Sequence, residues 1–402
     1  MNDENQPKVR FAGFTDPWEQ RKLGELGSTY SGLSGKSKND FGHGHAKFIT
    51  YMNVYSNPIS SKEMVENVEL DAKQNQVEKG DVFFTTSSET PDEVGMSSVW
   101  TYSEDNIYLN SFCFAWRPTK YLFDNNFLAY TLRSPFLRRS LNLLAQGISR
   151  YNISKQKLMK ENIFVPILDE QIKIGNFMKY FDDLIAANQD KLDQLKDVKK
   201  LLMQKIFDQE WRFAGFTDPW EQRKAKEVFK SFSEKEHESY PVLSVTQDQG
   251  VVYRDNLDID IKYDPATLSN YKVVHPYDFV ISLRSFQGGF ELSEILGISS
   301  PAYTIFNFIS RENHNCYYWK FFFKTYKFIE SLKKVTFGIR DGKSISFTEF
   351  SSLKLCFPST YEEQKQIGEL FNKIVDNLIA ANQVKLDKLK EMKKWLMQNM
   401  FI

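Results

Sequence analysis

The chain has 402 residues, of which 52 are basic and 52 acidic, so its formal net charge is zero at neutral pH. Its 41% hydrophobic and 26% charged content is ordinary for a globular protein, and it has no run of about 18 apolar residues that would predict a transmembrane helix. The polar N-terminus is unlike a secretory signal, and the three cysteines have no paired spacing. Together these features predict a cytoplasmic protein with reduced thiols.

An internal repeat organises the whole sequence. The segment RFAGFTDPWEQRK occurs at 10–22 and again, unchanged, at 212–224. A second pair of segments, 183–207 and 377–401, is identical at 17 of 25 positions. The stretches between these matched segments share almost nothing. The sequence therefore predicts two units, each with its own body and a common tail.

The first body, residues 23–168, contains short aromatic and β-branched runs between turn signals. These runs predict strands at 48–51, 81–85 and 112–116. A Gly/Ser-rich stretch at 31–45 predicts a loop, and 121–144 predicts a helix that is interrupted at Pro135.

The first tail, residues 169–207, predicts one long helix because apolar or near-apolar residues recur every three or four positions. A helix of this length spans about 58 Å, which is too long for one small domain. The second tail repeats the stripe, so we expect the two helices to pair in an antiparallel intramolecular coiled coil. The expected seam residues are Leu184, Asn188, Leu192, Leu195, Leu378, Asn382, Leu386 and Leu389.

The two asparagines in this stripe leave two interpretations open. A buried Asn188 or Asn382 would cost stability and fix the register of the pair, whereas an asparagine at the edge of the stripe would be solvated.

The second body, residues 225–360, repeats the style of the first and predicts strands at 241–246, 279–283 and 303–309. Residues 319–332 predict a helix. The expected fold is thus mixed α/β (α+β), with two recognition domains joined by two long helices in a pseudo-twofold repeat. The expected boundaries are 1–168 and 212–361 for the domains, and 169–211 and 362–402 for the helices.

Several catalytic motifs are incomplete in this sequence. Gly35-Lys36-Ser37 resembles the end of a phosphate-binding loop, but Tyr30 stands where that motif requires glycine. His43 and His45 have no third ligand at usable spacing, so no metal site is expected. We find no catalytic constellation and expect the chain itself to be non-catalytic.

Each body ends in a basic stretch. Residues 131–160 hold seven basic residues and no acid, and residues 313–348 hold seven basic residues and two acids. Such a stretch is either a solvated surface or a site that neutralises phosphates. Because the basic stretch recurs at the same place in two dissimilar bodies, we weigh phosphate binding and a solvated surface as equal interpretations.

This arrangement resembles the specificity subunit of type I restriction–modification systems. The resemblance rests on the duplicated KL-x-x-LK-x-x-KK-x-LMQ tails, on EQ-x-x-IG before each tail, and on LRSFQGGF at 283–290 and SPAYT at 300–304. It implies that each body reads one half of a bipartite, asymmetric double-stranded DNA site while the paired helices set the spacing. A non-catalytic scaffold with two interaction domains on a coiled coil is the alternative.

The resemblance also implies the partners. Two methyltransferase subunits would dock on the helices and bring S-adenosylmethionine, and two restriction subunits would use ATP and Mg²⁺. The chain itself would bind no cofactor and no membrane.

The residues that could contact DNA are mostly Arg, Lys, Asn and Gln, which bind phosphates or base edges. Arg150 and Arg340 each follow a Gly-Ile dipeptide shortly before a long helix, and we expect them to have equivalent roles. For every candidate, an exposed and solvated side chain is the alternative. In the first body the candidates are Lys36, Lys38, Arg138, Arg139, Gln146, Ser149, Arg150, Tyr151, Asn152 and Lys155. In the second body they are Arg284, Ser285, Gln287, Lys333, Arg340 and Lys343.

Overall fold

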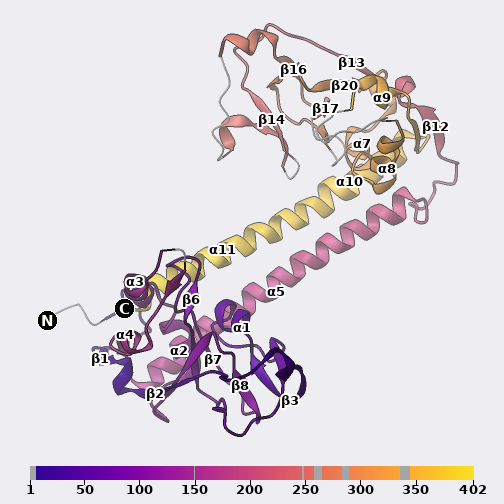
Figure 1. Cartoon of the computed structure of the whole chain (residues 1–402). Coiled ribbons are helices and arrows are strands. Elements are labelled where there is room, and N and C mark those ends of the chain that lie inside the picture. Colours follow the sequence, from indigo (N-terminus) through magenta and orange to yellow (C-terminus); the bar gives the residue numbers. More distant parts are fainter. Residues whose placement is uncertain (1–5, 149, 247–248, 258–264, 283–288, 336–344) are drawn as a thin grey trace. The chain divides into compact units, whose positions relative to one another are not determined.

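The computed structural model describes residues 6–148, 150–246, 249–257, 265–282, 289–335 and 345–402. The chain divides into two compact units (Figure 1). Unit 1 consists of Met1–Gln189 and Val384–Ile402, and unit 2 of Asp190–Gln383. Each unit contains one body and part of each long helix. Within the described residues, no helix is both long enough and apolar enough to cross a membrane.

The two predicted long helices are present. The first is α5, Leu168–Phe207, an uninterrupted helix of 40 residues. The second tail has three consecutive parts, which are α10 (Tyr361–Glu369), the π-helix η8 (Leu370–Asp376) and α11 (Asn377–Asn399).

The π-helix coincides with a one-residue difference between the repeats. Leu184 follows Glu170 by 14 residues, whereas its counterpart Leu378 follows Glu363 by 15. An extra residue in a regular α-helix would rotate everything beyond it by about 100°. A π-helical turn closes on i+5 and takes up such a residue locally. The segment η8 therefore keeps the residues on both sides of it on their original faces.

The helices run antiparallel, as predicted. In unit 1 the beginning of α5 packs with the end of α11, where Lys393 pairs with Asp182. In unit 2 the end of α5 packs with the second tail, where Lys199 Nζ lies 2.6 Å from Asp376 Oδ1. The apolar core of unit 1 includes residues of both helices and of the segment that follows α11. These are Ile174, Met178 and Phe181 of α5, Leu396 of α11, and Met400 and Phe401 beyond it.

The predicted stripe is buried at its central positions. Leu192 and Leu386 are each 1% exposed, while Leu195 and Leu389 are partly buried. Leu184 is also partly buried, and Leu378 is exposed.

Both stripe asparagines are buried, so neither is the solvated edge residue of the alternative interpretation. Asn188 is 5% and Asn382 7% exposed. Each side-chain amide donates a hydrogen bond to the carbonyl four residues earlier in its own helix, and both bonds measure 2.7 Å. A role in fixing the register stays a prediction.

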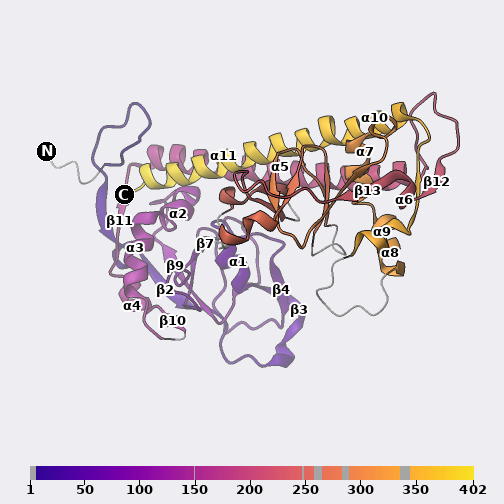
Figure 2. The ribbon, with the colours of Figure 1, turned by 90° about the horizontal axis from the view of Figure 1, so that it is seen from above.

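The body of unit 1 is built on two sheets. One is antiparallel in the order β2-β9-β5-β7, with β2 beside β9 (Figure 2). Its strands are Gly27–Ser31, Cys113–Pro118, Val82–Thr85 and Ser97–Val99. The other has the order β4-β3-β8, formed by Val65–Val68, Phe41–Ile49 and Ile107–Leu109. Short strands β6 (Ser87–Ser88) and β10 (Tyr151–Asn152) pair with each other.

The helices of this body are α1 (Tyr51–Ser56), α2 (Asn125–Thr131), α3 (Pro135–Leu144) and α4 (Lys155–Leu158). The predicted interruption at Pro135 is confirmed, because Pro135 begins α3 and Ser134 caps it. Two local predictions were wrong. The loop predicted at 31–45 contains the start of β3 from Phe41 onward, and the strand predicted at 48–51 ends at Ile49, because Thr50 caps α1.

The body of unit 2 contains an antiparallel sheet in the order β13-β20-β17-β18. These strands are Phe229–Phe232, Thr304–Phe308, Phe279–Ile281 and Phe290–Leu292. Two further strand pairs are β14–β15 and β16–β19, formed by Leu243–Thr246 with Gly250–Tyr253 and by Lys272–Val274 with Gly297–Ser299.

The helices of unit 2 correct one prediction. The helix expected at 319–332 is two helices, α7 (Cys316–Phe322) and α8 (Tyr326–Val335). Thr325 separates them, because its hydroxyl accepts a hydrogen bond from the backbone N–H of Phe328, 3.3 Å away. The shorter helices are α6 (Ala225–Val228) and α9 (Phe347–Ser351).

The repeated segment forms the same strand pair in both units. Strand β1 (Glu19–Lys22) pairs with β11 (Asn162–Val165), and β12 (Glu221–Lys224) pairs with β21 (Lys354–Phe357). The registers match residue for residue, since Glu19 faces Val165 and Glu221 faces Phe357. Each pair ties the start of a body to the strand that leads into its long helix.

Candidate nucleic-acid interface

An ion pair between a partly buried arginine and a buried glutamate joins the repeated segment to the long helix in each unit. Arg10 donates from Nε and Nη2 to the two carboxylate oxygens of Glu170, at 2.6 and 2.8 Å. Arg212 makes the same two bonds to Glu363, at 2.9 and 2.7 Å. The hydrogen bonds to these glutamates raise the pKa of both arginines. This geometry gives the first residue of the EQ-x-x-IG motif its structural role.

The glutamine of the same motif holds the start of a body helix. Gln171 accepts a hydrogen bond from the backbone N–H of Asp124, 3.0 Å away, and donates to a proline carbonyl just ahead of α5, at 2.9 Å. Gln364 makes the corresponding bonds, both at 3.0 Å, to the N–H of Asn315 and to a proline carbonyl ahead of α10. Asp124 and Asn315 are the N-caps of α2 and α7.

The motif's glycine lies against the same helix start. A Cβ atom on Gly175 would lie 2.5 Å from the backbone nitrogen of Phe127, and one on Gly368 would lie 2.7 Å from that of Tyr318. Neither position has room for a side chain. Sequence reasoning noticed the motif and missed Arg10 and Arg212 as its partners. The sequence did hold a signal for this pairing. The arginine recurs in the RFAGFTDPWEQRK segments and the glutamate recurs in the EQ-x-x-IG motifs.

Four predicted DNA-contact residues meet in one hairpin of unit 1. Gln146 and Asn152 exchange backbone hydrogen bonds of 3.0 and 2.9 Å, which enclose the hairpin, and Tyr151 continues into the pairing with β6. Gln146, Arg150 and Asn152 are exposed, and Tyr151 is partly buried. The fifth predicted residue of this segment, Ser149, lies outside the described residues.

The predicted lysines of unit 1 differ in their surroundings. Lys36 Nζ lies 3.1 Å from Asp71 and 4.0 Å from Asp40, so its charge is already shared between two carboxylates. Lys38 is exposed. Lys155 is partly buried, with its ammonium 5.7 Å from the centre of the Phe114 ring.

The arginines of the basic stretch divide into structural and exposed residues. Arg138 Nη2 donates to the carbonyls of Asp92 (2.7 Å) and Val94 (2.8 Å). Arg133 is similarly committed to backbone carbonyls, including that of Ser97 at 2.6 Å. Burial lowers the pKa of both guanidinium groups, that of Arg133 to about 10. Arg139 is exposed.

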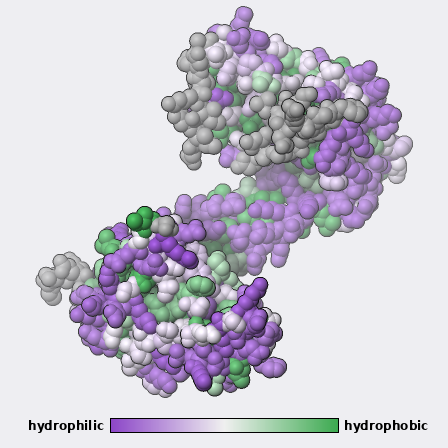
Figure 3. Space-filling model, viewed as in Figure 1, coloured by the Kyte–Doolittle hydropathy of each residue, from purple (hydrophilic) through white to green (hydrophobic). Residues whose placement is uncertain are grey.

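In unit 2 the structure describes one predicted DNA-contact residue. Lys333, on α8, is exposed and lies 2.5 Å from Glu330 Oε1. The other five candidates, Arg284, Ser285, Gln287, Arg340 and Lys343, lie outside the described residues. Figure 3 shows a largely hydrophilic surface on the visible faces of both units, with small hydrophobic patches.

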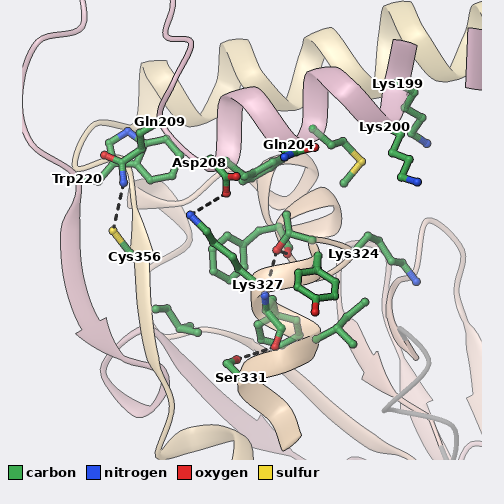
Figure 4. Close-up of a pocket in the computed structure, with 18 of the residues that line it drawn as sticks. Lys199, Lys200, Gln204, Asp208, Gln209, Trp220, Lys324, Lys327, Ser331 and Cys356 are labelled. Carbon is green, nitrogen blue, oxygen red and sulfur yellow. Dashed lines mark hydrogen bonds and ion pairs between the residues drawn. The ribbon is translucent and has the colours of Figure 1, made fainter. Parts of the chain in front are cut away.

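Unit 2 also contains a cavity of about 960 Å³ between the end of α5, the start of α8 and β21 (Figure 4). Phe207, Trp220 and Leu355 contribute apolar surface. Lys327 crosses toward Asp208, with 2.7 Å between Nζ and Oδ1. Six lysines line the cavity, namely Lys196, Lys199, Lys200, Lys324, Lys327 and Lys354.

Unit 1 has aromatic rings at positions equivalent to two residues that line this cavity of unit 2. Phe164 and Cys356 are equivalent by strand register, and Phe136 and Lys327 are the second residues of α3 and α8. The two phenylalanine rings pack edge to face with their centres 5.5 Å apart. Lys327 and Cys356 thus line the cavity of unit 2 at the positions where unit 1 has this aromatic pair. Among the residues that the structure describes, no cluster of three or more His, Cys, Asp or Glu could hold a metal ion.

The repeated segments at 10–22 and 212–224, together with the two long helices, form a repeated frame that carries two dissimilar bodies. This arrangement defines a class of protein with two separate binding domains, and comparison with known proteins identifies the family. The family model for the type I restriction modification DNA specificity domain matches residues 15–197 and 217–391. The chain therefore belongs to the family of type I restriction–modification specificity subunits, which are non-catalytic parts of restriction enzyme complexes.

Individual relatives agree over nearly the full length. A putative type I restriction enzyme MjaX specificity subunit from Methanocaldococcus jannaschii is 23% identical over 433 residues, covering 98% of this chain and 95% of that protein. The S subunit structure from M. genitalium has a TM-score of 0.62 at 14% identity, covering 99% of both chains. The HsdS subunit structure from Thermoanaerobacter tengcongensis has a TM-score of 0.50 at 16% identity, covering 97% of this chain and 98% of that one. At such identities the structures support the fold alone.

Proposed function

We propose that this chain reads a bipartite, asymmetric DNA site for a type I restriction–modification complex. In this proposal residues 1–168 and 212–361 each recognise one half-site, and the paired helices hold them over a spacer that is not read. The observation that carries the proposal is the repeated frame. Matching ion pairs, Arg10–Glu170 and Arg212–Glu363, fix two bodies of different sequence to the long helices in the same way.

Electrostatics supports a DNA interface in unit 1 at the exposed part of the basic stretch. Arg139, Arg150, Lys157 and Lys160 are exposed there. Phosphate contacts from these residues would position the body, and side chains of the hairpin at 146–152 would read base edges. The zero net charge of the chain implies weak DNA binding by the isolated subunit, so partners would supply much of the electrostatic attraction.

The helices offer two equivalent surfaces for methyltransferase subunits. Besides the buried stripe, each unit exposes three large apolar side chains on its helix segments, and these are candidates for contact with a partner. Tyr180, Met392 and Trp395 are exposed in unit 1, and Ile374, Val198 and Leu201 stand at the equivalent positions of unit 2. Two such surfaces suit two methyltransferase subunits carrying S-adenosylmethionine. Two restriction subunits using ATP and Mg²⁺ would complete the complex.

Co-expression with methyltransferase subunits from the same source, followed by genome-wide mapping of methylated bases, tests this proposal. The expected result is one split motif whose two halves are separated by a constant number of unread base pairs. Replacing residues 225–360 by the corresponding segment of a relative should change one half-site and preserve the other. A continuous motif, or a swap that changes both halves, would contradict independent reading by two bodies.

A further inference from the structure

One apolar side chain stands out on the surface of unit 1. Ile148, in the hairpin at 146–152, is 99% exposed, more than any other large hydrophobic residue that the structure describes. A single exposed apolar residue is common on protein surfaces and needs no explanation by itself. Ile148 differs from such an isolated residue in its backbone support and in its neighbouring side chains.

The backbone holds Ile148 at a defined place. Reciprocal hydrogen bonds between Gln146 and Asn152 close the hairpin, and the N–H of Ile153 donates to the carbonyl of Thr86, 3.0 Å away. Gly147 has φ +146°, and a Cβ there would lie 2.0 Å from the carbonyl oxygen of Arg150. The residue before Ile148 must therefore be glycine, and the hairpin displays the isoleucine from an anchored base.

The neighbouring side chains are of the types that can read base edges. Gln146, Arg150 and Asn152 are exposed on the same hairpin, and amide and guanidinium groups form the paired hydrogen bonds that distinguish adenine and guanine in the major groove. That groove admits a two-stranded ribbon of this kind. A β-branched side chain also loses little rotamer freedom on contact, because its χ1 angle is already restricted.

The second body repeats the dipeptide at the matching place in the sequence. Gly147-Ile148 precedes Arg150 and the Ile153-Ser154 start of α4, and Gly338-Ile339 precedes Arg340 and the Ile345-Ser346 start of α9. Residues 338–340 lie outside the described residues, so this second observation is one of sequence. Two bodies of otherwise different sequence thus both have a Gly-Ile dipeptide one or two residues before an arginine.

We propose that Ile148 contacts the 5-methyl group of a thymine in the major groove of the half-site read by the first body. Apolar side chains recognise thymine through this methyl group, the only apolar group that a base pair presents in that groove. The contact would make Ile148 a specificity-determining residue that works beside Arg150. This inference rests on the proposed function.

The test replaces each thymine of the mapped half-site by uracil, which removes the methyl group and preserves base pairing. Binding by the assembled methyltransferase is measured by titration. The wild type should lose about fourfold in affinity at one position, the factor expected for one buried methyl group. Ile148→Ala should bind the thymine duplex about fourfold more weakly and lose nothing further with uracil at that position.

Two variants serve as controls. Ile148→Val keeps the branched carbon and should retain sensitivity to uracil at the same position. Leu70→Ala removes another exposed apolar side chain of unit 1, outside the hairpin, and should behave as the wild type does. Melting temperatures should be unchanged in all three variants, because both side chains are solvated before binding.

Several outcomes would overturn the contact. These are a wild type indifferent to uracil at every position, an Ile148→Ala variant as sensitive as the wild type, and a half-site without any A·T pair. An Ile148-dependent rise in 2-aminopurine fluorescence would instead indicate a wedge between base steps and would also overturn it. A wild-type complex without sequence preference would overturn the proposed function itself, and with it the contact.

Discussion

The two units make the same contacts to the frame and have different interiors. At the junction, Gln171 and Gln364 accept hydrogen bonds of the same length, 3.0 Å, from the backbone N–H groups that begin α2 and α7. Inside, the sheet of unit 2 packs around phenylalanines such as Phe229 and Phe306, whereas unit 1 uses Trp116 and Val82. At these junctions the glutamines and glycines of the motif contact backbone atoms of each body, and a backbone contact is compatible with many body sequences.

The largest effect should come from the stripe that both helices share. Leu192→Asp and Leu386→Asp each bury an unpaired charge at a position that is 1% exposed, and each should cost roughly 3–5 kcal/mol. Gln194→Asp, at an exposed position of α5 outside the proposed docking surfaces, should change stability by less than about 0.5 kcal/mol. Denaturant unfolding and co-elution with the methyltransferase measure these effects. Normal assembly of the Leu192→Asp, Leu386→Asp double variant would exclude the paired-helix spacer.

The two ion pairs should differ in a way that sharpens the comparison. Arg10→Ala leaves Glu170 buried without its partner and should cost about 3–5 kcal/mol. Arg212→Ala should cost less, because the indole N–H of Trp220 still donates to Glu363, at 3.2 Å. The indole nitrogen of the equivalent Trp18 has no hydrogen-bond partner. Equal losses in chemical denaturation would mean that the tryptophan contributes nothing.

The two glycines of the motif should respond alike. Gly175→Ala and Gly368→Ala force a methyl group against backbone nitrogens, and each should cost roughly 1–3 kcal/mol. Gly13→Ala is a poor control because Gly13 has φ +95°, so Ala186→Ser on the exposed face of α5 serves better. Thermal unfolding would show a lower midpoint for both glycine variants, and an unchanged midpoint would contradict the close helix contact.

Filling the cavity should make unit 2 more like unit 1. The double variant Lys327→Phe, Cys356→Phe recreates the aromatic pair of Phe136 and Phe164 and should stabilise unit 2 by about 1 kcal/mol. The ion pair lost with Lys327 is largely exposed and contributes little. The reverse exchange in unit 1 should destabilise it. A destabilised filled variant would show that the lysine-lined cavity has a shape that the protein requires.

The smallest effect on stability should come from Arg150. Arg150→Ala should leave unfolding unchanged and, if the guanidinium binds phosphate, reduce the salt dependence of DNA binding by about one charge. Arg138→Ala should instead lower the stability and leave the salt dependence of DNA binding unchanged, because Arg138 donates hydrogen bonds to two backbone carbonyls. A loss confined to one base pair would assign Arg150 to base reading. Binding titrations at several salt concentrations decide between these outcomes.

The sequence predicted the architecture where the physical signal is local or repeated. The three- and four-residue spacing of apolar positions predicted α5, and Pro135 marked the start of α3. The break between α7 and α8 was missed, because Thr325 interrupts the helix by capping α8, and no proline marks this position in the sequence. The start of β3 was missed because Gly42 and Gly44 adopt positive φ where the strand bulges against β4, a conformation that reads as a loop.

The candidate site was less predictable, since a charged residue in a basic stretch has no visible partner in the sequence. Arg138 reaches carbonyls 44 and 46 residues away, and Lys36 pairs with Asp71. Such non-local contacts decide whether a cation is available to DNA. Gln146, Arg150 and Asn152, all predicted as DNA contacts, lie in the hairpin that the Gln146–Asn152 backbone bonds close. Their binding to DNA stays a prediction.

The π-helix η8 has a consequence for how this frame tolerates change. A single inserted codon in a long paired helix normally misaligns every later contact, and so should be eliminated by selection. In the second tail the extra residue between Glu363 and Leu378 is confined to one widened turn. Insertions and deletions of one residue could therefore persist at this point and alter the helix length while both ends keep their partners. We therefore expect a one-residue change of length to be tolerated better at η8 than within the uninterrupted α5.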